Sequence, residues 1–176
     1  MGLVAFFTLT VHGANYLAMK TEGLVQARSR DIAAKAWWGV ALMSVVALIS
    51  VSSIRPEIWV NFQEHLWGFI FPLFGLLGLA GMFYYNRRTR DTKAFVSSAV
   101  FIGGMLASTA FGQFPDVLHA STDPQYSLTA FNTITHEYGL GVGLIWWTIG
   151  ILIALGYFTY LFYSFRGKIK LSAEGY

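Results

Sequence analysis

Five apolar runs recur along the chain, and their length limits what it can fold into. A helix needs about 20 predominantly apolar residues to cross the hydrocarbon core of a bilayer. The runs cover roughly residues 2–19, 33–54, 65–85, 94–114 and 138–165. We therefore expect an all-α integral membrane protein with five transmembrane helices, a four-helix bundle plus one further helix, in a single domain over residues 1–176. The opening stretch, MGLVAFFTLTV, has no basic segment and no cleavage site typical of a signal peptide, so we interpret it as a span.

The composition supports a membrane protein and excludes several classes of function. Hydrophobic residues make up 55% of the chain and charged residues 12%, whereas a soluble domain carries about 25% charge. Cysteine is absent, which excludes disulfides, thiolate metal sites and haem attached through cysteine. The formal net charge of +3 gives no indication of nucleic-acid binding, and we expect no nucleic-acid partner.

Basic residues are sorted by the predicted spans. All the lysines and arginines except Arg55 fall after the first, third or fifth apolar run. Because cytoplasmic segments carry the excess of Lys and Arg, this predicts an external N-terminus and a cytoplasmic C-terminus. The residues on the predicted cytoplasmic side are Lys20, Arg28, Arg30, Lys35, Arg87, Arg88, Arg90, Lys93, Arg166, Lys168 and Lys170.

Polar residues share one face of the first span. Thr8, His12, Asn15, Tyr16 and Lys20 are spaced as residues on one side of a helix. Facing lipid would leave these groups without hydrogen-bond partners, so we expect this face to contact other helices or another subunit. Arg28, in the following basic segment, is a further contact candidate.

The fourth span carries small residues at every fourth position, Gly104, Ser108 and Gly112. This spacing lets the backbone of another helix approach closely. We therefore expect these three positions to be packing contacts.

Connectors and loops are expected between the spans. We expect a basic connector over residues 20–35, a loop from Arg55–Pro56 to Gln63, and a longer loop from Pro115 to Glu137. Pro72 is expected to kink the third span.

The histidines allow two interpretations. A haem held between two imidazoles needs them at one depth, and His65 and His136 both lie near the predicted external ends of spans. Alternatively, His12 hydrogen-bonds within a helix interface and the other histidines are ordinary interface or loop residues.

None of the nine acidic residues lies in the middle of a span, which argues against a pump or channel formed by this chain alone. The acids near His119 and His136 fit no metal-ligand spacing, so we expect no metal site and a solvated loop.

Three segments resemble subunit II of cytochrome bd quinol oxidases, in the same order and spacing. In that family a [Gln/His]-Gly-Ala-x-Tyr-Leu pattern leads to a basic residue, a Thr, a Gly and then an Arg-containing connector, where Arg28 and Arg30 stand here. The matching residues are 10–23 (TVHGANYLAMKTEG), then 94–98, Phe114-Pro115 and 127–129 with Asn132, then 143–147 to Tyr157 and 165–168.

The resemblance extends over almost the whole chain but only to the C-terminal half of that subunit. It implies a split subunit II, a shortened relative or a fragment, with a partner chain supplying the N-terminal half. It also implies a multi-pass protein of a prokaryotic (inner) cell membrane. In that family subunit I binds haem b and haem d, so this chain is expected to bind no cofactor of its own. The ligand considered for it is a quinone or lipid held in a groove.

The implied function is that of a non-haem structural subunit in a respiratory chain. It would pack against and stabilise the haem-bearing subunit of a cytochrome bd-type quinol:oxygen oxidoreductase, without performing the redox step itself. Its expected partners are subunit I, the chain with the missing half, membrane lipids and quinol. The alternative is a small b-type cytochrome membrane anchor that transfers electrons through a haem on His65 and His136.

Overall fold

The computed structural model describes residues 1–168. Its internal contacts divide the chain into two compact units, Met1–Gln113 and Phe114–Gly167. Within residues 1–168, five helices are long and apolar enough to cross a membrane, and they confirm the predicted all-α architecture: Gly2–Lys20, Gly23–Ile54, Leu66–Arg87, Asp91–Gln113 and Glu137–Ser164.

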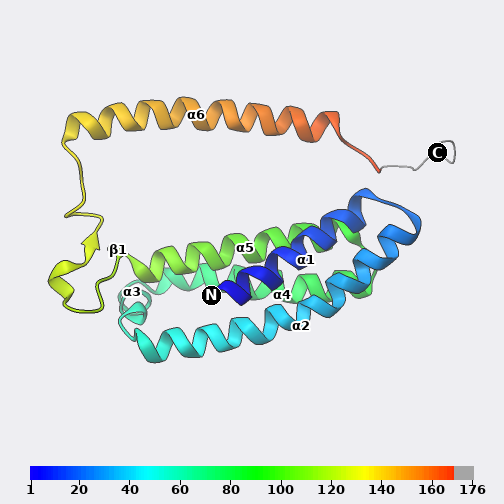
Figure 1. Cartoon of the computed structure of the whole chain (residues 1–176), viewed down its shortest axis with the longest axis horizontal. Helices are drawn as coiled ribbons and strands as arrows, with labels where there is room; N and C mark the ends of the chain where they lie inside the picture. The colour runs from blue at the N-terminus through cyan, green and yellow to red at the C-terminus, as the bar shows by residue number, and fades with distance from the viewer. Residues whose placement is uncertain (169–176) are drawn as a thin grey trace. The chain divides into compact units, whose positions relative to one another are not determined.

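The first unit is a four-helix bundle formed by α1 (Gly2–Lys20), α2 (Gly23–Ile54), α4 (Ile70–Arg87) and α5 (Asp91–Gln113). Helix α1 packs against α2 and α5, and α4 packs against α5 and α2, which closes a ring (Figure 1). Each helix contributes one buried side chain to the centre of this ring. These four residues are Val11, Val40, Met82 and Phe101.

Glycines bring α4 and α5 into close contact. A Cβ atom added at Gly104 would lie 2.9 Å from the carbonyl oxygen of Phe71, and one at Gly78 would lie 2.8 Å from that of Ser97. Real Cβ atoms essentially never come this close to another atom. The two backbones therefore fit together only because these positions have no side chain.

The connector predicted for residues 20–35 is wrong, because α2 already begins at Gly23. Only Thr21 and Glu22 separate it from α1, and Gly23 has a φ of +66°, which suits a residue without a side chain. Hydropathy marks the part of a helix that lies in the hydrocarbon, not the point where the helix starts. The polar first turns of α2 are helical and extend the helix to 32 residues.

The loop predicted up to Gln63 is also wrong in part. Helix α2 ends at Ile54, just before Arg55–Pro56 as expected, but a short helix α3 (Ile58–Glu64) follows. Its Phe62 is buried and packs on Phe111 of α5, with ring centroids 5.0 Å apart. The apolar residues of this segment thus serve to cover one end of the bundle.

Pro72 lies in the first turn of α4. The irregularity comes just before it, as the 3-10 helix η1 (Leu66–Phe69). A proline ring crowds the carbonyl group four residues earlier, here that of Gly68, which lies within this 3-10 turn. The expected disturbance therefore takes the form of a tighter turn at the start of the span.

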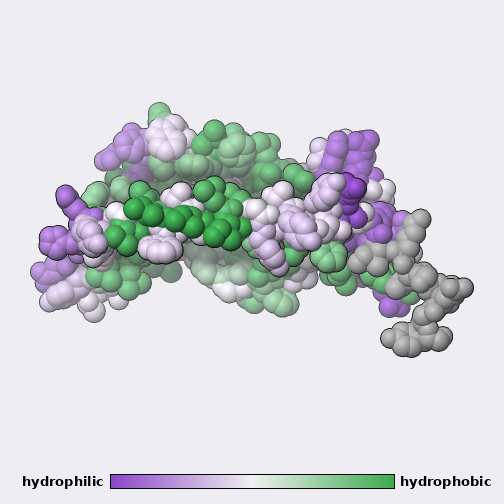
Figure 2. Space-filling view, turned by 90° about the horizontal axis from the view of Figure 1, so that it is seen from above, coloured by the Kyte–Doolittle hydropathy of each residue, from purple (hydrophilic) through white to green (hydrophobic). Residues whose placement is uncertain are grey.

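The second unit contains a small hairpin and one long helix. Strands β1 (Asp116–Leu118) and β2 (Leu128–Thr129) are antiparallel, with the 3-10 turn η2 (Pro124–Tyr126) between them, where a loop was predicted. Helix α6 (Glu137–Ser164) follows, and none of its residues is buried. Figure 2 shows hydrophobic residues along the middle of α6.

Candidate functional site

Polar side chains of three bundle helices meet along one line, which we term the polar seam. It runs from the end of the bundle that holds the turn between α1 and α2 toward the middle of α1. The residues of the polar seam are His12 and Asn15 of α1, Gln26 and Arg30 of α2, and Asp91 and Ser98 of α5.

An ion pair forms the end of the polar seam. Arg30 donates from Nε to Oδ1 of Asp91 and from Nη2 to Oδ2, and both donor–acceptor distances are 2.7 Å. Gln26 adds a hydrogen bond from Nε2 to Oδ2 of Asp91 (3.0 Å) and another to the carbonyl oxygen of Ala18 (3.1 Å). Asp91 is also the first residue of α5, where the helix dipole favours a negative charge. The carboxylate thus accepts three hydrogen bonds from α2, and Gln26 extends the contact to α1, so that the cluster joins α1, α2 and α5.

His12 occupies the inner end of the polar seam. Its Nδ1 lies 2.7 Å from Oγ of Ser98. That hydroxyl group donates a hydrogen bond to the carbonyl oxygen of Phe95, at a distance of 2.6 Å. Because a hydroxyl group has a single proton, Nδ1 of His12 must be the donor to Ser98. The imidazole also stacks on the ring of Phe95, with centroids 4.7 Å apart. His12 is therefore held in one tautomer and one orientation against α5.

The other residues predicted to share the polar face of α1 lie in different surroundings. Asn15 is 1% exposed and its Nδ2 lies 3.5 Å from the carbonyl oxygen of Ala94, a long hydrogen bond. Tyr16 is exposed and contacts Phe95 through its ring, at 5.6 Å between centroids. Thr8 has a buried Oγ1 without a hydrogen-bond partner. Lys20 is the last residue of α1.

The remaining predicted contacts lie on α2 and α5. Arg28 is exposed on α2. Ser108 donates to the carbonyl oxygen of Gly104 within its own helix (2.7 Å). A Cβ atom at Gly112 would lie 2.7 Å from Cγ2 of Ile58 and 3.1 Å from Cε2 of Phe62, so this glycine accommodates α3.

Sequence reasoning missed four residues of the polar seam: Gln26, Arg30, Asp91 and Ser98. Arg30 lies in the predicted connector over residues 20–35, and Asp91 lies between the third and fourth predicted spans, on the same predicted side of the membrane. Their opposite charges, on the same predicted side of the membrane, were the signal that could have identified them as a pair. Ser98 gave none, because a serine in an apolar helix often bonds only to its own backbone.

The alternative haem pair stays a prediction. His65 and His136 are both exposed and belong to different units. His119 contacts Asp116 of the same hairpin, with 3.0 Å between Nδ1 and Oδ2. Within residues 1–168, no group of three or more His, Asp or Glu side chains is placed to hold a metal ion.

The family described as cytochrome bd terminal oxidase subunit II matches residues 1–165. This chain belongs to that family. The resemblance carried by the sequence segments is thereby confirmed. With five helices able to span a membrane, the chain is a multi-pass membrane protein.

Two curated relatives match nearly the whole chain. A protein of Haemophilus influenzae named "Probable cytochrome oxidase subunit 2" is 25% identical over 193 aligned residues, which cover 96% of this chain and 51% of the relative. A protein of Bacillus subtilis named "Cytochrome bd ubiquinol oxidase subunit 2" is 24% identical over 161 residues, covering 90% of this chain and 46% of the relative. The chain thus spans about half the length of these relatives.

Proposed function

We propose that this chain is a non-haem structural subunit of a cytochrome bd-type quinol:oxygen oxidoreductase in a respiratory chain. It packs against a haem-bearing subunit and stabilises it, while haem b and haem d are bound by that partner. The family match over residues 1–165 and the names of both relatives support this assignment.

The structural role is supported by a contrast between two kinds of group. Polar side chains of the bundle are hydrogen-bonded within it, whereas the apolar side chains of α6 are not buried. Arg30, Asp91 and His12 are engaged with other residues of the bundle. Helix α6, by contrast, is apolar on every side and buries none of its residues. A helix that is hydrophobic all round belongs in a membrane or in a large core, and other subunits and lipid can cover it.

The second part of the proposal concerns the rest of the assembly. Because the relatives are about twice as long, we propose that a further chain supplies the other half of subunit II. The excess of Lys and Arg next to the turns at one end of the bundle supports a cytoplasmic location for that end. The N-terminus would then face the outside.

The test is purification in mild detergent through an affinity tag added after Tyr176. Mass spectrometry identifies the chains that copurify, and a reduced-minus-oxidised absorption spectrum identifies their haems. We expect a larger membrane subunit with b-type and d-type absorption bands, a chain resembling the missing half, and quinol oxidation coupled to oxygen reduction.

Two results would overturn the proposal. One is recovery of the chain with a single b-type haem that remains after all other subunits are removed, which would favour the haem pair His65 and His136. The other is recovery of partners without any haem or quinol oxidase activity. Replacing both histidines with leucine separates the first case from the proposal, because the spectrum should stay unchanged if a partner holds the haems.

A further inference from the structure

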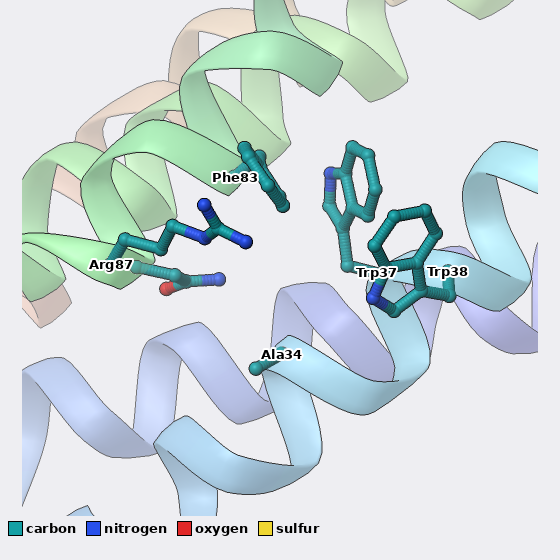
Figure 3. Close-up of a pocket in the computed structure, with 6 residues that line it drawn as sticks. Ala34, Trp37, Trp38, Phe83 and Arg87 are labelled. Carbon is teal, nitrogen blue, oxygen red and sulfur yellow. The ribbon is translucent and has the colours of Figure 1, made fainter.

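A groove lies between α2 and α4 and has a volume of about 170 Å³. Residues of α2 face residues of α4 across it, as Figure 3 shows. Its lining consists of Ala34, Trp37 and Trp38 from α2, and Phe83, Asn86 and Arg87 from α4. Three aromatic rings, one amide and one guanidinium group therefore meet in a small space outside the polar seam.

Arg87 differs from the paired basic residues of the bundle in what holds its charge. Arg30 is paired with Asp91 and Lys35 with Asp31. The guanidinium group of Arg87 instead lies over the ring of Phe83, 4.1 Å from its centroid. Among residues 1–168, no carboxylate forms an ion pair with Arg87. Its N–H groups are therefore available to an anion from outside the chain.

Asn86 presents a second group without a partner. Its Nδ2 atom is buried and makes no hydrogen bond. Buried amide groups are nearly always paired with an acceptor, and an exception calls for an explanation such as a bound ion or water. An acceptor oxygen in the groove, beside Arg87, would supply the missing partner after a small shift of the side chain.

The two tryptophans give the groove the character of a membrane interface. Trp37 is fixed by a hydrogen bond from its Nε1 to the carbonyl oxygen of Leu79 (2.9 Å) and packs on Phe83. Trp38 is 63% exposed. Arg87 is the last residue of α4, at the end of a span. Tryptophan rings settle at the level of lipid headgroups, so the groove combines apolar surface with a cation at that depth.

We propose that this groove binds the phosphate group of an anionic phospholipid. A guanidinium group matches phosphate with two parallel hydrogen bonds, and the exposed ring of Trp38 covers the glycerol and upper acyl chain. A neutral quinone would make no use of the unpaired cation. A free phosphate ion would make no use of the tryptophans. This site goes beyond the proposed oxidase role and does not depend on it.

The experiment uses the purified full chain, with any subunits that copurify, and native mass spectrometry. The probes are phosphatidylglycerol and phosphatidylcholine with identical acyl chains. The variants are Arg87→Gln and, as a matched control, Arg88→Gln. Arg88 is the neighbouring residue and also lies over an aromatic ring, that of Tyr84 at 5.0 Å, but it does not line the groove.

We expect the unaltered protein to retain phosphatidylglycerol about fivefold more than phosphatidylcholine, the factor that one basic group contributes near an anionic surface. Arg87→Gln should abolish this preference, and Arg88→Gln should leave it within about twofold of the original, as expected for a screened surface charge. Arg87→Lys should keep most of this preference, because the charge remains, but should lower the retention of both lipids, because both carry the phosphate and the paired hydrogen bonds to it are lost.

Four outcomes would overturn the proposal. The first is equal retention of both lipids by the unaltered protein, a result that needs no variant to fold. The second is an equal effect of Arg87→Gln and Arg88→Gln. The third is displacement of the lipid by inorganic phosphate, which would indicate a site for free phosphate. The fourth is displacement by a short-chain quinone, which would indicate a quinone site.

Discussion

The two units of the chain differ in how far their side chains find packing and hydrogen-bond partners within the same unit. In the bundle, Val11, Val40, Met82 and Phe101 pack on one another, and the ion pair of Arg30 and Asp91 closes one end. In the second unit, the hairpin is held by its own hydrogen bonds, such as that from Asn132 Nδ2 to the carbonyl oxygen of Ser127 (2.8 Å). Its helix α6 has no buried residue at all.

This difference indicates where the chain is self-sufficient. In a membrane, lipid competes well for apolar side chains, so helices associate through close packing and polar contacts. The bundle has both, in its glycine positions and its polar seam. Helix α6 buries none of its residues, so the second unit by itself does not cover its apolar surface. The predictions below test whether stability follows this division.

The largest effect is expected at the contact between α4 and α5. Gly104→Leu should destabilise the bundle by about 3 kcal/mol or prevent its folding, because the side chain would enter the backbone of α4. Gly103→Leu is the control, since a Cβ atom there meets nothing within 4 Å. Unfolding in detergent, followed by circular dichroism, measures both. Equal losses for the two variants would contradict the packing described for α5.

A smaller loss is expected at the ion pair. Asp91→Asn removes the charge that holds Arg30 and Gln26 and should cost about 2 kcal/mol, within the range for hydrogen bonds to charged groups. Asp31→Asn breaks only the exposed pair with Lys35 and should cost about 0.3 kcal/mol. A double-mutant cycle of Asp91→Asn with Arg30→Gln measures the coupling directly. Zero coupling would mean that the pair contributes nothing to stability.

The sequence predicted the number of spans but not all their ends. Length and hydropathy located five helices, because a lipid environment demands apolar residues over a fixed thickness. The same measure placed the start of α2 at residue 33 instead of Gly23, and it interpreted α3 as a loop. Polar helical turns outside the hydrocarbon carry no such signal. Their helical state depends on packing against neighbouring helices, as the contact of Phe62 with Phe111 illustrates.

The sequence predicted the residues that α1 contributes to the polar seam, but not their partners on the other helices. The spacing of His12 and Asn15 identified a polar face of α1, because helical periodicity is a local property of the sequence. Their partners, Ser98 and the carbonyl oxygen of Ala94, lie more than 75 residues further along the chain, with sequence separations of 86 and 79. Pairing over such distances depends on the order of helices around the bundle, which periodicity does not encode.

A still smaller effect is expected at the inner end of the polar seam. His12→Leu removes the hydrogen bond to Ser98, and Ser98→Ala removes it from the other side. Each should cost about 0.6 kcal/mol, the average for such bonds between membrane helices. The double variant should cost less than the sum. Unchanged stability, together with unchanged assembly and oxidase activity of the tagged complex, would rule out a contact role for His12.

The smallest effect is expected in α6, and it is the sharpest test of the division between the units. Gly150→Leu makes the same chemical change as Gly104→Leu, but a Cβ atom at Gly150 meets nothing within 4 Å. The free energy of unfolding of the full chain in detergent should therefore stay within about 0.5 kcal/mol of that of the unaltered protein. The same variant is then examined in the purified complex. A loss of copurifying subunits there, without a loss of stability in the chain itself, would identify the surface around Gly150 as a subunit contact. A large loss in the chain alone would show that α6 packs on its own protein, and the division between the two units would fail.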